Sequence, residues 1–166
     1  MTTARRLFGF TLIELLLTIG IVSILFTLAI PAYIDFQNNQ ELRQERENLV
    51  TNLRFAQSQA LGGVRTSCAP DEKLTGWYVS FTQTSYSIGY YCDLRPVSLR
   101  LIDLSKTSIT FSIDPLIGTV IFRPNNQAVG LLINDTVGLL SGDYTMTLMK
   151  GPKNVRVKVR GTGDIF

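Results

Sequence analysis

The sequence predicts an α+β fold, in which one long N-terminal helix packs on an antiparallel β-sheet or β-sandwich domain. Two observations predict this fold. Apolar residues run almost without interruption from Phe10 to Ile30, and good helix formers continue to Leu61. From Gly76 onward the hydrophobic period changes to two, and turn residues recur every few positions. With 166 residues the chain is long enough for one modest domain with a hydrophobic core.

The segment from Phe10 to Ile30 has the length and composition of a membrane span. Glu14 is its single charged residue. A helix of this length rises roughly 30 Å, which is the thickness of the hydrocarbon core of a bilayer. Arg5 and Arg6 precede the segment, so the positive-inside rule predicts that the short N-terminal end stays in the cytoplasm. The domain that follows the span is then expected outside the cytoplasm.

The helix is expected to continue beyond the span. Pro31 has no amide hydrogen and is expected to kink the helix or break it locally. The stretch from Ile34 to Leu61 contains neither proline nor glycine, and Gly62 and Gly63 mark its C-terminal end. Five apolar residues of this stretch lie on one helix face and predict a stripe that packs on a sheet: Leu42, Leu49, Leu53, Ala56 and Ala60.

The rest of the chain is predicted to form short antiparallel strands joined by turns. Alternating apolar residues between turn signals predict strands at residues 77–81, 85–92, 97–102, 109–113, 119–122, 128–133, 144–149 and 155–159. The pair Leu139-Leu140 fits a loop or a strand equally well. The expected organisation is a membrane-spanning helix half (10–30), an amphipathic helix half (31–63) and a C-terminal β-domain (64–166).

Cys68 and Cys92 are the only cysteines, and two interpretations of them stay open. In an oxidising compartment they form one disulfide, which stabilises the fold by about 3–4 kcal/mol in the chain-entropy model. Alternatively, both are buried free thiols. The first interpretation is favoured, because Cys68 lies in a predicted loop and Cys92 closes a predicted strand.

The sequence does not point to catalysis or to a cofactor. It contains no histidine and no CxxC pair, so metal, haem and thiol-redox chemistry are poorly supported. No acid–base pair, glycine-rich phosphate loop or nucleophile motif stands out. We therefore expect a protein that is not an enzyme and that binds neither a metal nor a cofactor.

The N-terminus combines a basic leader, a glycine, an aromatic residue and an intramembrane acid. The run reads Arg-Arg-Leu-Phe-Gly-Phe-Thr-Leu-Ile-Glu-Leu from Arg5 onward. Here the sequence resembles the type IV prepilin family, which includes the pseudopilins of type II secretion. Gly9, Phe10 and Glu14 match the family pattern in type and spacing, and Pro31 lies where many members kink.

The resemblance implies how the chain is processed and which partners it binds. A prepilin peptidase is expected to cut between Gly9 and Phe10, remove the leader peptide (1–9) and methylate the new amine of Phe10. The implied partners are this peptidase, other pilins or pseudopilins, the inner-membrane assembly platform, and membrane lipid before assembly. The protein is expected to be a single-pass inner-membrane protein with an extracytoplasmic domain, and then part of a pilus or pseudopilus. An ordinary signal peptide would have a shorter apolar core and small residues before its cut.

Glu14 is a carboxylate within hydrocarbon, which costs a few kcal/mol, so such an acid is usually functional and paired. The resemblance implies that Glu14 pairs with the N-terminal amine of a neighbouring subunit and sets the axial register of a filament. The alternative is a solvated carboxylate close to the membrane interface.

The end of the helix, from Asn52 to Leu61, resembles the FimT/GspH-like minor pilins and pseudopilins. Gln57 and Gln59 stand where that branch usually has arginine and glutamate, which weakens the likeness. The stretch from Gly76 to Val79 looks like the first strand of that branch, and residues 144–165 look like its closing hairpin. The resemblance implies a low-abundance subunit that primes or caps a filament. A major pilin, another minor pilin type and a tip adhesin stay open.

Five positive charges lie within eleven residues near the C-terminus: Lys150, Lys153, Arg156, Lys158 and Arg160. On a strand, the last three project from one face and could contact the phosphates of double-stranded DNA without reading its sequence. Some FimT-like proteins use C-terminal arginines in a Gly-Arg-x-Arg pattern for DNA uptake, but this pattern is not reproduced here. The favoured interpretation is the solvated face of an amphipathic strand, where like charges protect an edge.

Overall fold

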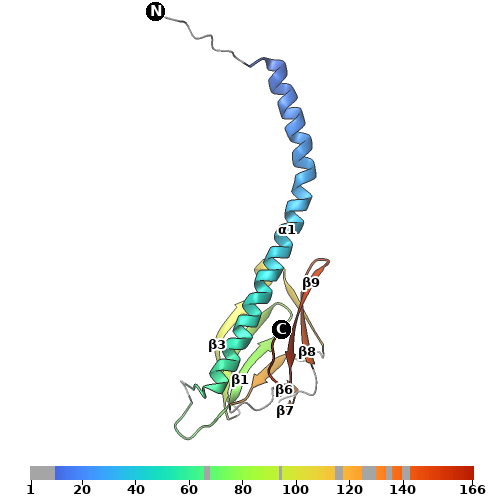
Figure 1. The fold of residues 1–166 in the computed structure, drawn as a ribbon. Helices are drawn as coiled ribbons and strands as arrows, with labels where there is room; N and C mark the ends of the chain where they lie inside the picture. The colour runs from blue at the N-terminus through green and yellow to red at the C-terminus, as the bar shows by residue number, and fades with distance from the viewer. Residues whose placement is uncertain are drawn as a thin grey trace, which may run out of the picture. The chain divides into compact units, whose positions relative to one another are not determined.

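A computed structural model describes residues 10–65, 68–93, 95–114, 118–124, 130–133, 136–139 and 143–166. The α+β fold is confirmed (Figure 1). The described residues form the helix α1 (Leu12–Leu61), the 3₁₀ turn η1 (Ser105–Thr107), and the strands β1 (Leu74–Phe81), β2 (Ser85–Cys92), β3 (Arg95–Asp103), β4 (Thr110–Asp114), β5 (Thr119–Phe122), β6 (Gly130–Ile133), β7 (Thr136–Leu139), β8 (Asp143–Lys150) and β9 (Lys153–Arg160). The chain divides into two compact units, Met1–Asn38 and Asn39–Phe166.

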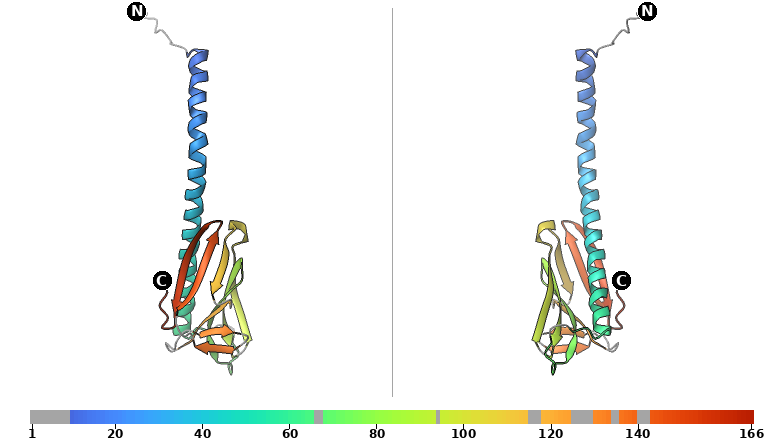
Figure 2. Two further views of the ribbon diagram at one scale, coloured as in Figure 1. Left: turned by 90° about the vertical axis from the view of Figure 1, so that its right-hand side faces the viewer. Right: turned by 90° about the vertical axis from the view of Figure 1, so that its left-hand side faces the viewer.

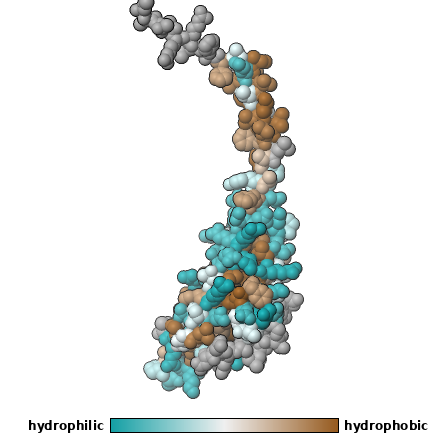
Figure 3. Space-filling view, in the orientation of Figure 1, coloured by the Kyte–Doolittle hydropathy of each residue, from teal (hydrophilic) through white to brown (hydrophobic). Residues whose placement is uncertain are grey.

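In the first unit, α1 is long and apolar enough to cross a membrane. Apolar side chains cover its first half (Figure 3), and large apolar side chains from Phe10 to Phe36 are exposed. The hydroxyls of Thr18, Ser23 and Thr27 donate to carbonyls one turn earlier, at 2.8–2.9 Å, so these polar groups are satisfied within the helix.

Pro31 lies inside α1, and the helix is uninterrupted there. Of the two effects expected of Pro31, a kink or a local break, the break is not seen within α1. Proline removes one backbone hydrogen bond from a helix, and small local adjustments of the neighbouring backbone can satisfy the carbonyl that loses its donor. A kink at Pro31 stays a prediction.

The second half of α1 ends at Leu61, as predicted, and its apolar stripe is buried. Leu42, Leu49, Leu53, Ala56 and Ala60 are each at most 1% exposed. Gly63 closes the helix in the left-handed region, with φ 62°. Its N–H donates to the Ala60 carbonyl (3.1 Å), and the Val64 N–H donates to the Gln59 carbonyl (3.1 Å), which is the Schellman pattern that satisfies the last turn.

The strands form two antiparallel sheets. Sheet A has the order β3-β2-β1-β5-β6-β7, and sheet B has the order β4-β8-β9. The bounds of β2 and β5 agree with the prediction, and the other predicted strands differ at their ends by one to three residues. The first two residues of the predicted strand 128–133 lie outside the described residues. Strand β7 was missed because four residues around Gly138 carry little alternation; Leu139 is its last residue, and Leu140 is not among the described residues.

One core joins the α1 stripe to both sheets within the second unit, where the views of Figure 2 place β8 and β9 beside α1. Trp77 packs at its centre: the ring centroid lies 5.2 Å from that of Tyr90 and 5.8 Å from that of Phe55. Its indole N–H donates to the Val64 carbonyl (2.9 Å), so burial leaves that donor satisfied. In the described part of the chain, every buried side-chain nitrogen or oxygen has a partner.

Candidate functional site

The start of α1 is fixed by a reciprocal pair of residues. Thr11 stands at the N-cap position, and its hydroxyl oxygen accepts a hydrogen bond from the Glu14 N–H (3.3 Å). The Glu14 carboxylate accepts in return from the Thr11 N–H (2.9 Å) and hydroxyl (3.0 Å). This is a capping box, which satisfies orphan donors at the helix N-terminus and favours negative charge there.

Thr11 is the residue of this site that the sequence analysis missed. The spacing Thr11-x-x-Glu14 before an apolar run is the sequence signature of a capping box, so the signal was present. Phe10 precedes the helix and is 88% exposed. Gly9, together with Arg5 and Arg6, lies outside the described residues. In the sequence, the predicted cleavage position between Gly9 and Phe10 precedes Leu12, the first residue of α1.

The basic strand is β9, and its predicted two-sided pattern is confirmed. Val157 and Val159 are fully buried in the core, while Arg156 and Arg160 are exposed and Lys158 is half-buried. Cross-strand partners on β8 extend this outer face: Thr147 lies opposite Arg156, and Thr145 lies opposite Lys158.

The five cations of the tail are not equivalent. Lys150 forms an ion pair with Glu41 of α1. Arg160 lies 3.3 Å from an oxygen of Asp143 and 3.7 Å from one of Asp164, and its guanidinium stacks on the ring of Phe166. Among the described residues, no ion pair forms with the other three: Lys153, Arg156 and Lys158. The outer face of β9 therefore offers fewer free charges than its sequence suggests.

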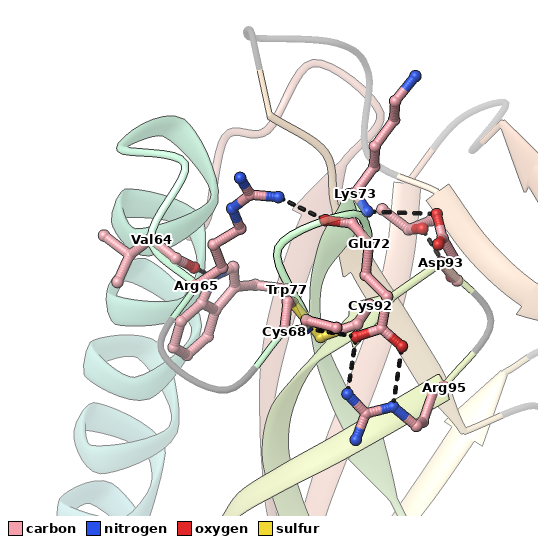
Figure 4. The surroundings of a disulfide bond; sticks show 11 residues. Val64, Arg65, Cys68, Glu72, Lys73, Trp77, Cys92, Asp93 and Arg95 are labelled. Atoms are coloured by element: carbon pink, nitrogen blue, oxygen red, sulfur yellow. Dashed lines mark hydrogen bonds and ion pairs between the residues drawn. A yellow bond between two sulfur atoms is a disulfide. The ribbon is translucent and has the colours of Figure 1, made fainter.

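Cys68 and Cys92 form a disulfide, which confirms the favoured interpretation (Figure 4). Glu72 lies beside it, and its carboxylate and the two sulfurs fall within 4.8 Å of one another. This spacing is that of a metal site, but the two sulfurs are bonded to each other and offer no thiolate ligand. The arrangement therefore acts as a staple between the loop before β1 and the end of β2.

Glu72 and Arg95 form an ion pair that reinforces this staple. The Glu72 carboxylate accepts from Arg95 Nη2 (2.7 Å) and Nε (3.2 Å), and from the Ala69 N–H (2.8 Å). The Arg65 guanidinium donates to the Glu72 carbonyl (2.5 Å). The hydrogen bond from Arg95, and then that from Ala69, hold the pKa of Glu72 below its ordinary value of 4.5.

This lowered pKa predicts a pH dependence of stability. A carboxyl whose folded-state pKa is depressed adds stability above its unfolded pKa, near 4.5, and loses it as the pH falls through the folded pKa. We expect Glu72→Gln to unfold at a lower temperature than the wild type at pH 7, with the gap closing as the pH falls from about 5 to 3. Melting followed by Trp77 fluorescence measures this gap. Asp71→Asn, at an exposed neighbouring acid, is the control, and a gap that stays constant with pH would contradict the argument.

Comparison with known proteins identifies the N-terminal segment. Residues 5–30 match the family model of the prokaryotic N-terminal methylation motif. The chain carries a type IV prepilin-like signal. This signal, which includes Gly9, Phe10 and Glu14, indicates a type IV pilin-like protein that is processed by a prepilin peptidase and assembles with other pilins. Together with the apolar first half of α1, it indicates a membrane-anchored protein. None of the curated proteins or solved structures compared with the chain matches it.

Proposed function

We propose that this pilin-like protein is a minor pilin or pseudopilin: a structural, non-enzymatic subunit of a type IV pilus or of a type II secretion pseudopilus, acting at the tip or in assembly initiation. The observation that carries the proposal is the signal at residues 5–30, which leads directly into a helix with exposed apolar side chains. Such a helix needs lipid before assembly and helices of other subunits afterwards, because water does not solvate it favourably.

The second unit is consistent with a FimT/GspH-like member of that group. After β9 the chain turns back at Gly163, and Val159 forms a bridge with Ile165. The residue that closes this turn, Gly163, accepts a hydrogen bond from Gln57 (2.9 Å), one of the residues at which the sequence departs from the branch pattern. The disulfide supports an extracytoplasmic place for this unit, because disulfides persist in oxidising compartments.

Glu14 provides the test of assembly. In the isolated chain its carboxylate is held by Thr11, and in a filament we expect it to face the amine of a neighbouring Phe10. Glu14→Gln keeps an oxygen that accepts from Thr11 but removes the charge. Thr11→Val keeps the charge and removes the cap.

We expect both variants to be processed, and we expect Glu14→Gln to reach sheared filaments at least about tenfold less than the wild type, because it leaves the amine without a counter-ion. Thr11→Val should reduce incorporation into filaments less than Glu14→Gln does. Quantitative immunoblots of sheared filaments, normalised to the membrane pool, measure the ratio. Wild-type incorporation of Glu14→Gln would contradict the assembly role.

A second candidate function is DNA binding for uptake in natural transformation. One observation favours it: Arg156 and Lys158 form no ion pair with the described residues and stand beside the hydroxyl side chains of Thr147 and Thr145. Arginine, lysine and threonine are among the side chains that contact phosphate oxygens, and such contacts carry no sequence information.

A titration of residues 38–166 with double-stranded DNA against salt tests this function. If the face binds phosphates, the slope of log K against log salt should be about −2 to −3. Each of Arg156→Ala and Lys158→Ala should make this slope shallower by about one. Arg160→Ala should change it less, because Arg160 is already paired with Asp143 and Asp164. Absence of binding at about 50 mM salt would remove DNA uptake and leave the filament role.

A further inference from the structure

A groove runs between α1 and the edge strand β3 in the second unit. One part, of about 420 Å³, is lined by residues of three elements: Thr51, Asn52, Phe55, Ile88, Leu99 and Arg100. A second part, of about 440 Å³, shares Thr51, Asn52 and Arg100 and continues to Glu45. Between Phe55 and Glu45 the helix rises about 15 Å, which is the length of four or five extended residues.

The groove changes character along its length. At one end Phe55 is 45% exposed and Leu99 is 51% exposed, and both flank the buried Ile88. At the other end Glu45 and Asp103 make the lining polar and acidic. Between the ends lies Arg100, which forms no ion pair with any of the described residues. The lining is thus complementary to a ligand that places an apolar group at one end of the groove and an anionic group at its centre.

The wall formed by β3 is also a free sheet edge. β3 is the last strand of sheet A, and in the described part of the chain no strand pairs with its outer side. Pro96 lacks an amide hydrogen, and the register between β2 and β3 shifts at Leu99. These two features disfavour pairing along the first half of β3 and leave the second half, which lines the groove, able to accept a strand.

In sheet B, the edge formed by β9 is covered by other parts of the chain. The outer side of β9 is covered where Phe166 exchanges two backbone hydrogen bonds with Lys158 (2.8 and 3.0 Å). Further along, Arg46 of α1 donates to the Arg156 carbonyl (3.2 Å). Among the described residues, the fold therefore closes the β9 edge with its own residues and leaves the second half of β3 open beside the α1–β3 groove.

We propose that the α1–β3 groove receives an extended segment of a neighbouring, different pilin subunit. Its backbone pairs with the second half of β3, an apolar side chain inserts between Phe55 and Leu99, and a carboxylate meets Arg100. A second copy of this chain fits less well, because symmetric pairing of the short segment around Arg100 would bring two arginines together. The identity of the partner as a pilin rests on the proposed function.

A photo-crosslinking amino acid at Leu99, in the full-length chain and in cells that assemble the filament, tests the proposal. We expect a product with a different chain that carries an N-terminal methylation motif, and mass spectrometry should map the junction to an extended segment containing Asp or Glu. Arg100→Glu should lower its yield at least fivefold, and Arg100→Lys should largely retain it. The same probe at Arg54, which is exposed but does not line the groove, is the control. Non-reducing gels check that each variant keeps its disulfide.

Products with lipid, with a second copy or with no chain at all would overturn the docking proposal, as would equal sensitivity of the Leu99 and Arg54 products to Arg100→Glu. These outcomes differ from failure of the proposed function. If the chain is cleaved at its signal and enters filaments but Leu99 captures no other pilin, only the docking proposal fails. If the chain is never cleaved or assembled, the proposed function fails first.

Discussion

Replacing Gly9 with leucine should leave the chain uncut at its full length of 166 residues. The resemblance to type IV prepilins implies a peptidase that cuts after Gly9, and we expect a branched side chain next to the scissile bond to block the close approach of the backbone that glycine allows. The bond also precedes α1, because the capping box of Thr11 and Glu14 sets the first helical residue at Leu12. The substitution therefore acts on recognition and not on the helix.

Intact-mass measurement of membrane-extracted protein gives the result directly. The wild type should begin at a methylated Phe10 and, having lost Arg5 and Arg6, carry a net charge of +1 in place of +3. Gly9→Leu should retain the leader in essentially every molecule and be missing from filaments. Gly20→Leu is the matched control, since no atom lies within 4 Å of an added Cβ at Gly20. Normal cleavage of Gly9→Leu would remove the basis for assigning the chain to a filament.

The parts of the fold that the sequence predicted are those with a strong local signal. The buried stripe of α1 followed from helical spacing alone, and the helix end followed from Gly62 and Gly63. The bounds of β2 were predictable because buried apolar side chains alternate along it, at Tyr86, Ile88, Tyr90 and Cys92. Strand β7 was not predictable in this way, because a strand of four residues that includes a glycine is too short to show an alternating pattern.

The parts that could not be predicted depend on contacts between distant residues. Lys150 and Glu41 are 109 positions apart, and no local pattern shows that this pair neutralises one of the five cations of the tail. The α1–β3 groove likewise exists only because the helix and the strand meet in space. Thr11 differs, because its capping-box spacing to Glu14 is a local signal. It was missed because Glu14 was interpreted only as an intramembrane acid with a role in assembly.

Removal of the Cys68–Cys92 disulfide should lower the free energy of unfolding by about 3.5 kcal/mol, the loop-closure value for cysteines 24 positions apart. The closed loop contains the β1–β2 hairpin, so the bond restricts in the unfolded chain the two strands that carry most of the aromatic core. A Cys68→Ser, Cys92→Ala double variant suits the two sites, because Cys68 is half-buried and Cys92 is fully buried.

Urea unfolding of the full chain in detergent, followed by fluorescence of Trp77, reports this difference, since Trp77 is the single tryptophan and is 3% exposed beside the bridged segment. A reductant separates the two possible origins of a loss. If the bond itself stabilises the fold, reduced wild type and the double variant should unfold at nearly the same urea concentration, and reductant should not shift the variant. If the variant is much less stable than reduced wild type, the loss comes from the cavity at Cys92. A change below about 1 kcal/mol in both would mean that the ion pair of Glu72 and Arg95 already holds these strands together without the bond.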